Sequence, residues 1–287
     1  MAGTLRERPF DGPLAERLSA GPGAATAIYW LGQAGFVLDI AGKRLVIDPY
    51  LSDSLAAKYR GTAYPHERMM AAPIAPDALR HVDFVLCTHA HTDHMDPGTL
   101  PALLSANPRA ALIAPRAVRS IALERSGIAV SRIRLVEAGE PLPLTENLTV
   151  TPTRAAHETL ERDEAGNHRF LGYAVSAPGG TVWHAGDTIP FNGQVEEVKA
   201  LHPDVTLLPV NGRRPELSER GIAGNLTMAE AVTLTRGIGA SAMIAHHYGL
   251  FAFNTADPET IDSTAKTISD LAVLRAREAI AFEWVPL

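Results

Sequence analysis

Disulfides and long apolar runs are both missing from this 287-residue sequence. Cys87 is the only cysteine, and a single thiol cannot form a bridge within the chain, so we expect it to pack as a small apolar side chain. No segment has the roughly eighteen unbroken apolar residues of a membrane-spanning helix. Residues 1–12 also lack the apolar stretch of a signal peptide. We therefore expect a cytoplasmic protein.

A surplus of basic residues is missing as well. The chain has 26 Lys and Arg against 32 Asp and Glu, which gives a formal net charge of −6 and a pI near 6.0. This balance argues against a broad basic surface for nucleic acid or an anionic membrane. We expect a small molecule as the partner, with no nucleic acid and no membrane, and we leave the formation of homo-oligomers open.

Two common catalytic signatures are also absent: the Gly-x-Ser-x-Gly elbow of serine hydrolases and the Gly-Lys-Ser/Thr loop that binds nucleotides. The sequence has instead a cluster of metal-ligand side chains, in the pattern His-x-His-x-Asp-His from His89 to His94, directly after the apolar run 82–87. Such a run is typical of a buried strand. A solvated, histidine-rich loop is the alternative, but four ligand-type residues at a strand end favour a metal site.

Strand geometry divides this cluster into two pairs. In an extended strand end His89 and His91 point to the same side, because side chains alternate with period two. If the chain then turns into a helix, Asp93 and His94 move to a second position beside the first pair. One short segment therefore has the residues to supply two ligands to each of two adjacent metal ions.

Three more ligand-type residues follow predicted strands further along the chain. His157 follows a strand over residues 147–154, Asp187 follows a strand over 181–185, and His247 follows a strand over 242–245. His184 and His246 lie close to these residues, but we expect His184 to be a buried structural residue and His246 to face elsewhere.

The intervening segments alternate between helices and strands, which predicts sheet layers covered by helices. We expect a leader over residues 1–26 and a single domain over 27–287. Residues 51–80 are irregular and carry positive charge, so they are interpreted as a flap over the active site or as a solvated connection. A helix is predicted from Pro258 to about Arg277, and a last strand over residues 280–285.

The whole pattern resembles the metallo-β-lactamase superfamily of binuclear metal hydrolases. The resemblance implies an α/β fold of four layers, αββα, with two divalent metal ions at one edge of the sheets. It implies that one ion is held by His89, His91 and His157, that the other is held by Asp93, His94 and His247, and that Asp187 bridges them. Imidazoles and carboxylates suit zinc, with manganese as an alternative.

Within the superfamily the sequence is similar to the family of L-ascorbate-6-phosphate lactonase. The likeness rests on residues 29–32 (Tyr-Trp-Leu-Gly), on 186–188 (Gly-Asp-Thr), and on His247 followed by Phe253 and Asn254. Many members of that family are metal-dependent hydrolases of unknown substrate. The resemblance therefore implies a hydrolase without specifying what it cleaves.

We expect hydrolysis of an ester, lactone or phosphodiester by a hydroxide that bridges two metals, with Asp93 or Asp187 accepting a proton. Asn211, Arg213 and Asn225 are candidates for binding an anionic group of the substrate, and a solvated loop is the alternative. Two other activities stay open. One is an iron-dependent oxidoreductase of the same fold, and the other is a nuclease.

Overall fold

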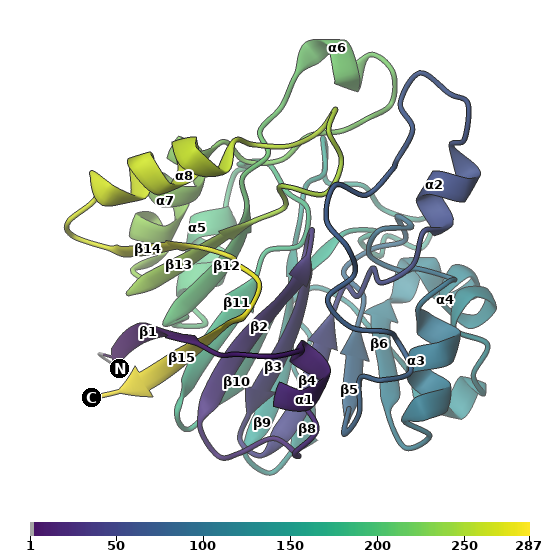
Figure 1. Ribbon diagram of the computed structural model, residues 1–287, viewed down its shortest axis with the longest axis horizontal. Helices are drawn as coiled ribbons and strands as arrows, with labels where there is room; N and C mark the ends of the chain where they lie inside the picture. Colours follow the sequence, from purple (N-terminus) through teal and green to yellow (C-terminus); the bar gives the residue numbers. More distant parts are fainter. Residues whose placement is uncertain (1–2) are drawn as a thin grey trace.

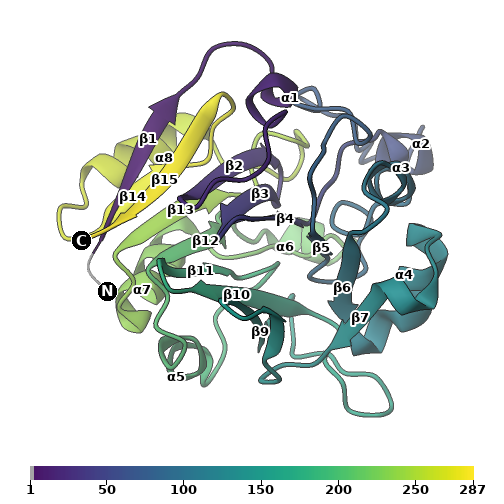
Figure 2. The ribbon, with the colours of Figure 1, turned by 90° about the horizontal axis from the view of Figure 1, so that it is seen from below.

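Two β-sheets packed face to face form the centre of the molecule, as the computed structural model shows for residues 3–287 (Figures 1 and 2). The first sheet has eight strands among these residues, in the order β1 (Gly3–Pro9), β15 (Ile280–Pro286), β2 (Thr26–Gly32), β3 (Gly35–Ile40), β4 (Lys43–Ile47), β5 (Phe84–Leu86), β6 (Ala111–Pro115) and β7 (Ile133–Val136). The second has seven, in the order β14 (Ala272–Arg275), β13 (Ala242–His246), β12 (Val205–Pro209), β11 (Gly180–His184), β10 (Leu171–Ala177), β9 (Leu148–Arg154) and β8 (Leu142–Thr145).

Helices cover the outer face of each sheet (Figure 1). On the first sheet these are α1 (Leu14–Arg17), α3 (Leu100–Ala106) and α4 (Arg119–Ser126), with the short 3-10 turns η1 (Arg116–Val118) and η2 (Val130–Arg132) beside them. On the second sheet they are α5 (Gln194–Lys199), α7 (Met228–Ile238) and α8 (Pro258–Lys266). Two short helices, α2 (Ser54–Lys58) and α6 (Pro215–Ser218), lie at one end of the sandwich. The predicted αββα fold is confirmed.

Alternating side chains of β2 explain why the first sheet is covered on both faces. Ile28 and Trp30 belong to the core between the sheets, whereas Tyr29 and Leu31 belong to the core under the helices. All four are at most 5% exposed. A strand that is apolar on both faces is stable only when another layer covers each face, because apolar surface is driven out of water.

Strand directions bring the ends of distant segments to one edge. β4, β5 and β6 are parallel, and so are β11, β12 and β13. β9 is antiparallel to β10, which is antiparallel to β11, so β9 also ends at the same edge as β11. The segments that follow β5, β9, β11 and β13 therefore meet, and these are the segments that carry the predicted ligands.

The prediction of a helix from Pro258 to about Arg277 was wrong in its second half. Helix α8 ends at Lys266, and residues 272–275 form β14, which pairs in parallel with β13. Leu271 and Val273 are buried there. A short apolar run fits a helix or a strand equally well by periodicity, and the free edge of the second sheet decides in favour of the strand.

The structure also has a strand where the sequence indicated no regular structure. Residues 3–9 form β1, antiparallel to β15 along its length. The strand could not be predicted from their polar composition, because only Leu5 is buried and the backbone makes the pairing. The division of the chain at residue 26 stays a prediction. Within residues 3–287 every helix is too short or too polar to cross a membrane.

Candidate metal centre

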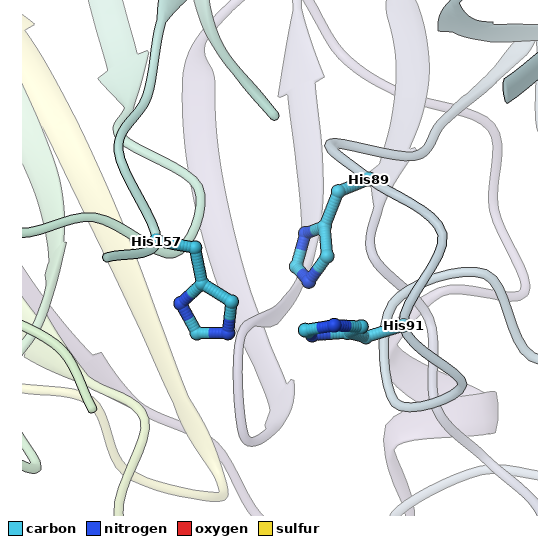
Figure 3. Close-up of side chains that lie close together, drawn as sticks. All are labelled: His89, His91 and His157. Atoms are coloured by element: carbon cyan, nitrogen blue, oxygen red, sulfur yellow. The ribbon is translucent and has the colours of Figure 1, made fainter. Parts of the chain in front are cut away.

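Three histidines from two separate loops point toward one another in Figure 3. His89 and His91 follow β5, where a tight turn is closed by hydrogen bonds from the amides of His94 and Met95 to the carbonyl of His91. His157 follows β9. One nitrogen of each imidazole lies within 4.8 Å of the others, so the three can share one metal ion.

A second group lies next to the first. Asp93, His94 and His247 have ligand atoms within 4.8 Å of one another. Asp187 lies between the groups: its Oδ2 is 3.2 Å from Nε2 of His247, 3.5 Å from Nε2 of His94 and 3.8 Å from Nε2 of His157. One carboxylate oxygen thus faces both groups of ligands.

A glycine places this carboxylate. Gly186 has a φ of +65°, and a Cβ there would lie 2.4 Å from the carbonyl oxygen of Leu171. Only glycine fits such a close approach. The chain can therefore turn sharply after β11 and direct Asp187 back toward the histidines.

Within residues 3–287, several buried polar atoms in this cluster lack a hydrogen-bond partner, and this shows whether the cluster suits a metal ion. Among the described residues, His89 Nε2, His94 Nε2 and Asp187 Oδ1 are buried without a hydrogen-bond partner. Leaving such groups unpaired costs about 1–3 kcal/mol each, and native proteins rarely leave them so. Ligand atoms about 2.0–2.3 Å from zinc lie roughly 3.3–3.8 Å apart in a tetrahedron, which matches the distances around Asp187. The residues therefore fit divalent metal ions.

Burial keeps two of these imidazoles in the form that binds metals. It lowers the pKa of His157 to about 4 and the pKa of His89 well below its ordinary value. Both rings are then neutral at pH 7, and each has a free lone pair. Burial alone would raise the pKa of Asp187, but the charges of His247 and His94 outweigh it and hold that pKa well below its usual range.

Asp48, which the sequence analysis missed, orients the ligands. It lies at the end of β4 with no exposed surface, and its φ of +46° is a strained conformation for this residue. Its Oδ2 accepts hydrogen bonds from His94 Nδ1 at 2.7 Å and from the hydroxyl of Thr88 at 2.6 Å. In the neutral ring, which is the form that binds metals, this hydrogen bond holds the proton of His94 on Nδ1 and leaves Nε2 free for a metal. The sequence contained one sign of this role: Asp48 directly follows a strand that ends beside the His89–His94 motif.

Replacing Asp48 with asparagine is therefore expected to weaken metal binding about 10- to 100-fold. The amide can present an N–H toward His94 Nδ1, which favours the ring tautomer that carries its proton on Nε2. Competition with a chromophoric chelator measures the affinity, and circular dichroism checks the fold. Asp270→Asn, an exposed change on the surface, is the control. Equal affinities in Asp48→Asn and the unaltered protein would contradict the role assigned to Asp48.

Gln33 and Arg125 support the same site from other elements, and the sequence analysis missed both. Gln33, with a φ of +50°, donates a hydrogen bond from Nε2 to Asp93 Oδ2 at 3.0 Å. Its carbonyl accepts from the amide of His247. Arg125 on α4 donates to the carbonyls of Ala90 and Met95 on either side of the ligand turn. The ligand loops are thus held by hydrogen bonds at several points.

Two further histidines lie close to the cluster without joining it. His184 is fully buried; its Nε2 donates to the carbonyl of Ala34 and its Nδ1 accepts from the amide of Gly186. The prediction of a structural role is confirmed. His246 faces the core, where its ring lies 5.2 Å from that of Phe36.

A cavity of about 540 Å³ opens beside the ligands. Besides His91, Asp93, His157, Asp187 and His247, it is lined by residues of the 51–80 excursion and of the segments 220–223 and 251–254. The excursion is tied to the ligand loop through Asp96, whose carboxylate accepts hydrogen bonds from the hydroxyls of Ser52 and Ser54. Whether the excursion opens and closes as a flap stays a prediction.

The three residues predicted to bind substrate, Asn211, Arg213 and Asn225, do not line the cavity. Arg213 forms an ion pair with Glu230 at the start of α7. Asn225 donates to Asn211, which in turn donates to Asn254 in the wall of the cavity. Their role in binding substrate stays a prediction.

Comparisons with known proteins agree with this geometry. A family model described as "Beta-lactamase superfamily domain" matches residues 43–248, a range that includes all seven ligand-type residues. A "UPF0173 metal-dependent hydrolase" of Caldivirga maquilingensis is 28% identical over 245 residues, which cover 84% of this chain and 90% of that protein.

Two solved structures show the same fold. Igni18, a metallo hydrolase from Ignicoccus hospitalis, is 20% identical with a TM-score of 0.65, over 91% of this chain and 97% of its own. An isothiocyanate hydrolase from Delia radicum gut bacteria is 20% identical with a TM-score of 0.66, over 87% and 95%.

Proposed function

The chain belongs to the beta-lactamase superfamily, and from that premise we propose that it is a metal-dependent hydrolase with two metal ions in its active site. The position of Asp187 carries this proposal, since one carboxylate oxygen lies between two groups of three ligand-type residues. A carboxylate shared by two dications offsets their mutual repulsion. Zinc is the metal that we propose, with manganese as the alternative.

The first group of ligands is His89, His91 and His157, and the second is Asp93, His94 and His247. Asp187 forms a third group with His89 and His94, one residue from each of the other two, and we assign it to both metal ions. Bound there, two divalent cations would supply Lewis acidity, which lowers the pKa of a water molecule toward neutrality and polarises the substrate oxygen. The protein's own contribution is to hold the ligands in place through Asp48, Gln33 and Arg125.

We assign the acceptance of a proton during the reaction to Asp93. Its side chain is 18% exposed and faces the cavity, whereas that of Asp187 is only 4% exposed and is surrounded by ligands. The hydrogen bond from Gln33 Nε2 fixes the Asp93 carboxylate in that position. A general base must lie within hydrogen-bond reach of the proton that it removes. Asp93 meets this condition for a substrate bound in the cavity, because it lines the cavity wall.

We propose an ester, a lactone or a phosphodiester as the bond that is cleaved. The narrower likeness to the L-ascorbate-6-phosphate lactonase family stays a prediction. So do the two alternatives from the sequence, the iron-dependent oxidoreductase and the nuclease.

Removal of the metal tests this proposal. Dialysis against a chelator is expected to abolish hydrolysis of the best substrate in a panel of esters, lactones and phosphodiesters. Activity should return as zinc or manganese is added back, and it should reach its maximum at about two ions per chain. Elemental analysis measures the content.

Three outcomes would count against the proposal. Full activity in the stripped protein would refute a metal-dependent mechanism, and a maximum at one ion would refute the binuclear one. Iron in the purified protein together with uptake of oxygen would favour the oxidoreductase.

A further inference from the structure

We propose that the cavity beside the ligands binds a flat apolar group of the substrate, an aryl ring or its equivalent, next to an anionic group. This inference rests on the proposed function for the identity of the reacting end of the substrate. It goes further because it specifies the part that is not cleaved.

One side of the cavity is formed by five ring-bearing residues, which we call the aromatic wall: Tyr59, Tyr64, His66, Phe251 and Phe253. They come from two segments far apart in the sequence. The first three belong to the 51–80 excursion after α2, and the two phenylalanines belong to the loop after β13.

The rings of the aromatic wall pack against one another. His66 stacks on Tyr59 with 4.2 Å between ring centroids, and it contacts Phe253 edge-on at 4.8 Å. Burial lowers the pKa of His66, which favours the neutral ring. Tyr64 lies 5.3 Å from Phe253. These distances are typical of favourable aromatic pairs, so the wall has a defined shape before any substrate binds.

Exposure distinguishes this wall from an ordinary core. Phe251 is buried at 3%, but the other four members are only half-buried, and all five line the cavity. Apolar rings that remain partly exposed around a cavity of this size are typical of a small-molecule site, because binding a ligand removes them from water. A planar apolar group is the partner that such faces accept best.

Two cations stand at the edge of the wall. Lys58 lies 5.0 Å from the ring of Tyr59, and Arg220 lies 5.6 Å from the ring of Tyr64. Over residues 3–287, neither of these exposed side chains forms an ion pair or a side-chain hydrogen bond with another residue. Helix α2, which ends at Lys58, and the loop after α6, which carries Arg220, lie at the same end of the sandwich (Figure 1).

The other charged residues that line the cavity indicate that the expected ligand is an anion. The carboxylates among the described lining residues are Asp93 and Asp187, and both are assigned to metal ions. Arg125 is a third cation in the lining, although backbone carbonyls already occupy it. Lys58 and Arg220 therefore favour a carboxylate, phosphate or sulfonate on the substrate.

Binding of simple probes to the metal-loaded protein tests the inference without any turnover. The probes are 2-naphthoate, which is flat and anionic, acetate, which has the charge without the rings, and 2-naphthamide, which has the rings without the charge. Calorimetry is expected to give 2-naphthoate an affinity about tenfold above that of acetate. Equal affinities for these two anions would overturn the proposal for the aromatic wall.

Variants locate the binding. Phe253→Leu and Tyr64→Leu should each lower the affinity for 2-naphthoate and for 2-naphthamide by about tenfold. Lys58→Gln and Arg220→Gln should each lower the affinity for 2-naphthoate about threefold and leave that for 2-naphthamide unchanged. Phe10→Leu and Lys199→Gln are matched controls, because neither residue lines this cavity. Losses no larger than those of the controls would refute the site.

The two proposals fail in different ways. If 2-naphthoate binds as expected but no ester, lactone or phosphodiester is cleaved, the proposed function falls and the binding site stands. If the panel is cleaved with no preference for aryl substrates that carry an anionic group, the hydrolase stands and this inference falls.

Discussion

His91→Ala should abolish hydrolysis while the protein stays folded. The imidazole belongs to the first group of ligands, and its side chain is exposed, so truncation leaves no buried cavity. Metal ions supply several kcal/mol of transition-state stabilisation, so loss of one ion is expected to lower kcat/KM about 10³-fold or more. The metal content should fall from two ions per chain toward one.

The control for His91→Ala removes an imidazole elsewhere. His81→Asn replaces an exposed ring whose backbone has a φ of +61°, a conformation that asparagine tolerates. Its kcat/KM and metal content should match those of the unaltered protein. Unchanged activity of His91→Ala, measured together with its metal content, would remove His91 from the ligand set and with it the first metal position.

The clustering of the ligand-type residues could be predicted from the sequence because each of them lies in a segment that follows the end of a strand. A strand end is a fixed point in a sheet, so the residues after β5, β9, β11 and β13 could be assigned to one edge once the resemblance indicated which sheets they form. His89, Asp187 and His247 are placed together in the structure as that reasoning requires.

Supporting residues were harder to predict, because their roles depend on contacts between segments far apart in the sequence. Asp48 is an ordinary aspartate before a proline until His94 is found 2.7 Å away. Gln33 looks like a residue of a hairpin turn until its amide is seen beside Asp93. The strand β14 was missed for a related reason, since only the edge of the neighbouring sheet distinguishes it from a helix.

The aromatic wall shows the same limit. Tyr59 and His66 lie in a segment without periodicity, and nothing local in the sequence relates them to Phe253 nearly two hundred residues later. These residues come together because the segment after α2 and the loop after β13 both line the cavity beside the ligand-type residues. The residues proposed to contact the substrate therefore lie in long loops, whereas the ligand-type residues follow strand ends.

A buried ion pair far from these loops stabilises the first sheet. Arg44 on β4 is 1% exposed and lies opposite Asp39 on β3 in the strand register. Two parallel hydrogen bonds of 2.8 Å join its guanidinium to the Asp39 carboxylate. The same guanidinium donates to the carbonyls of Leu18 and Arg80. It thus ties the strands to the segments around Leu18 and Arg80.

Asp39→Ala is expected to lower the free energy of unfolding by about 3–5 kcal/mol, because it leaves a charged guanidinium buried without its counter-charge. Chemical denaturation measures the change. The double variant Asp39→Leu with Arg44→Met should regain most of that loss, since an apolar pair needs no compensation. Glu140→Ala, which removes the exposed partner of Arg116, should scarcely move the midpoint. A double variant as unstable as Asp39→Ala would show that Arg44 acts through its backbone contacts and not through its charge.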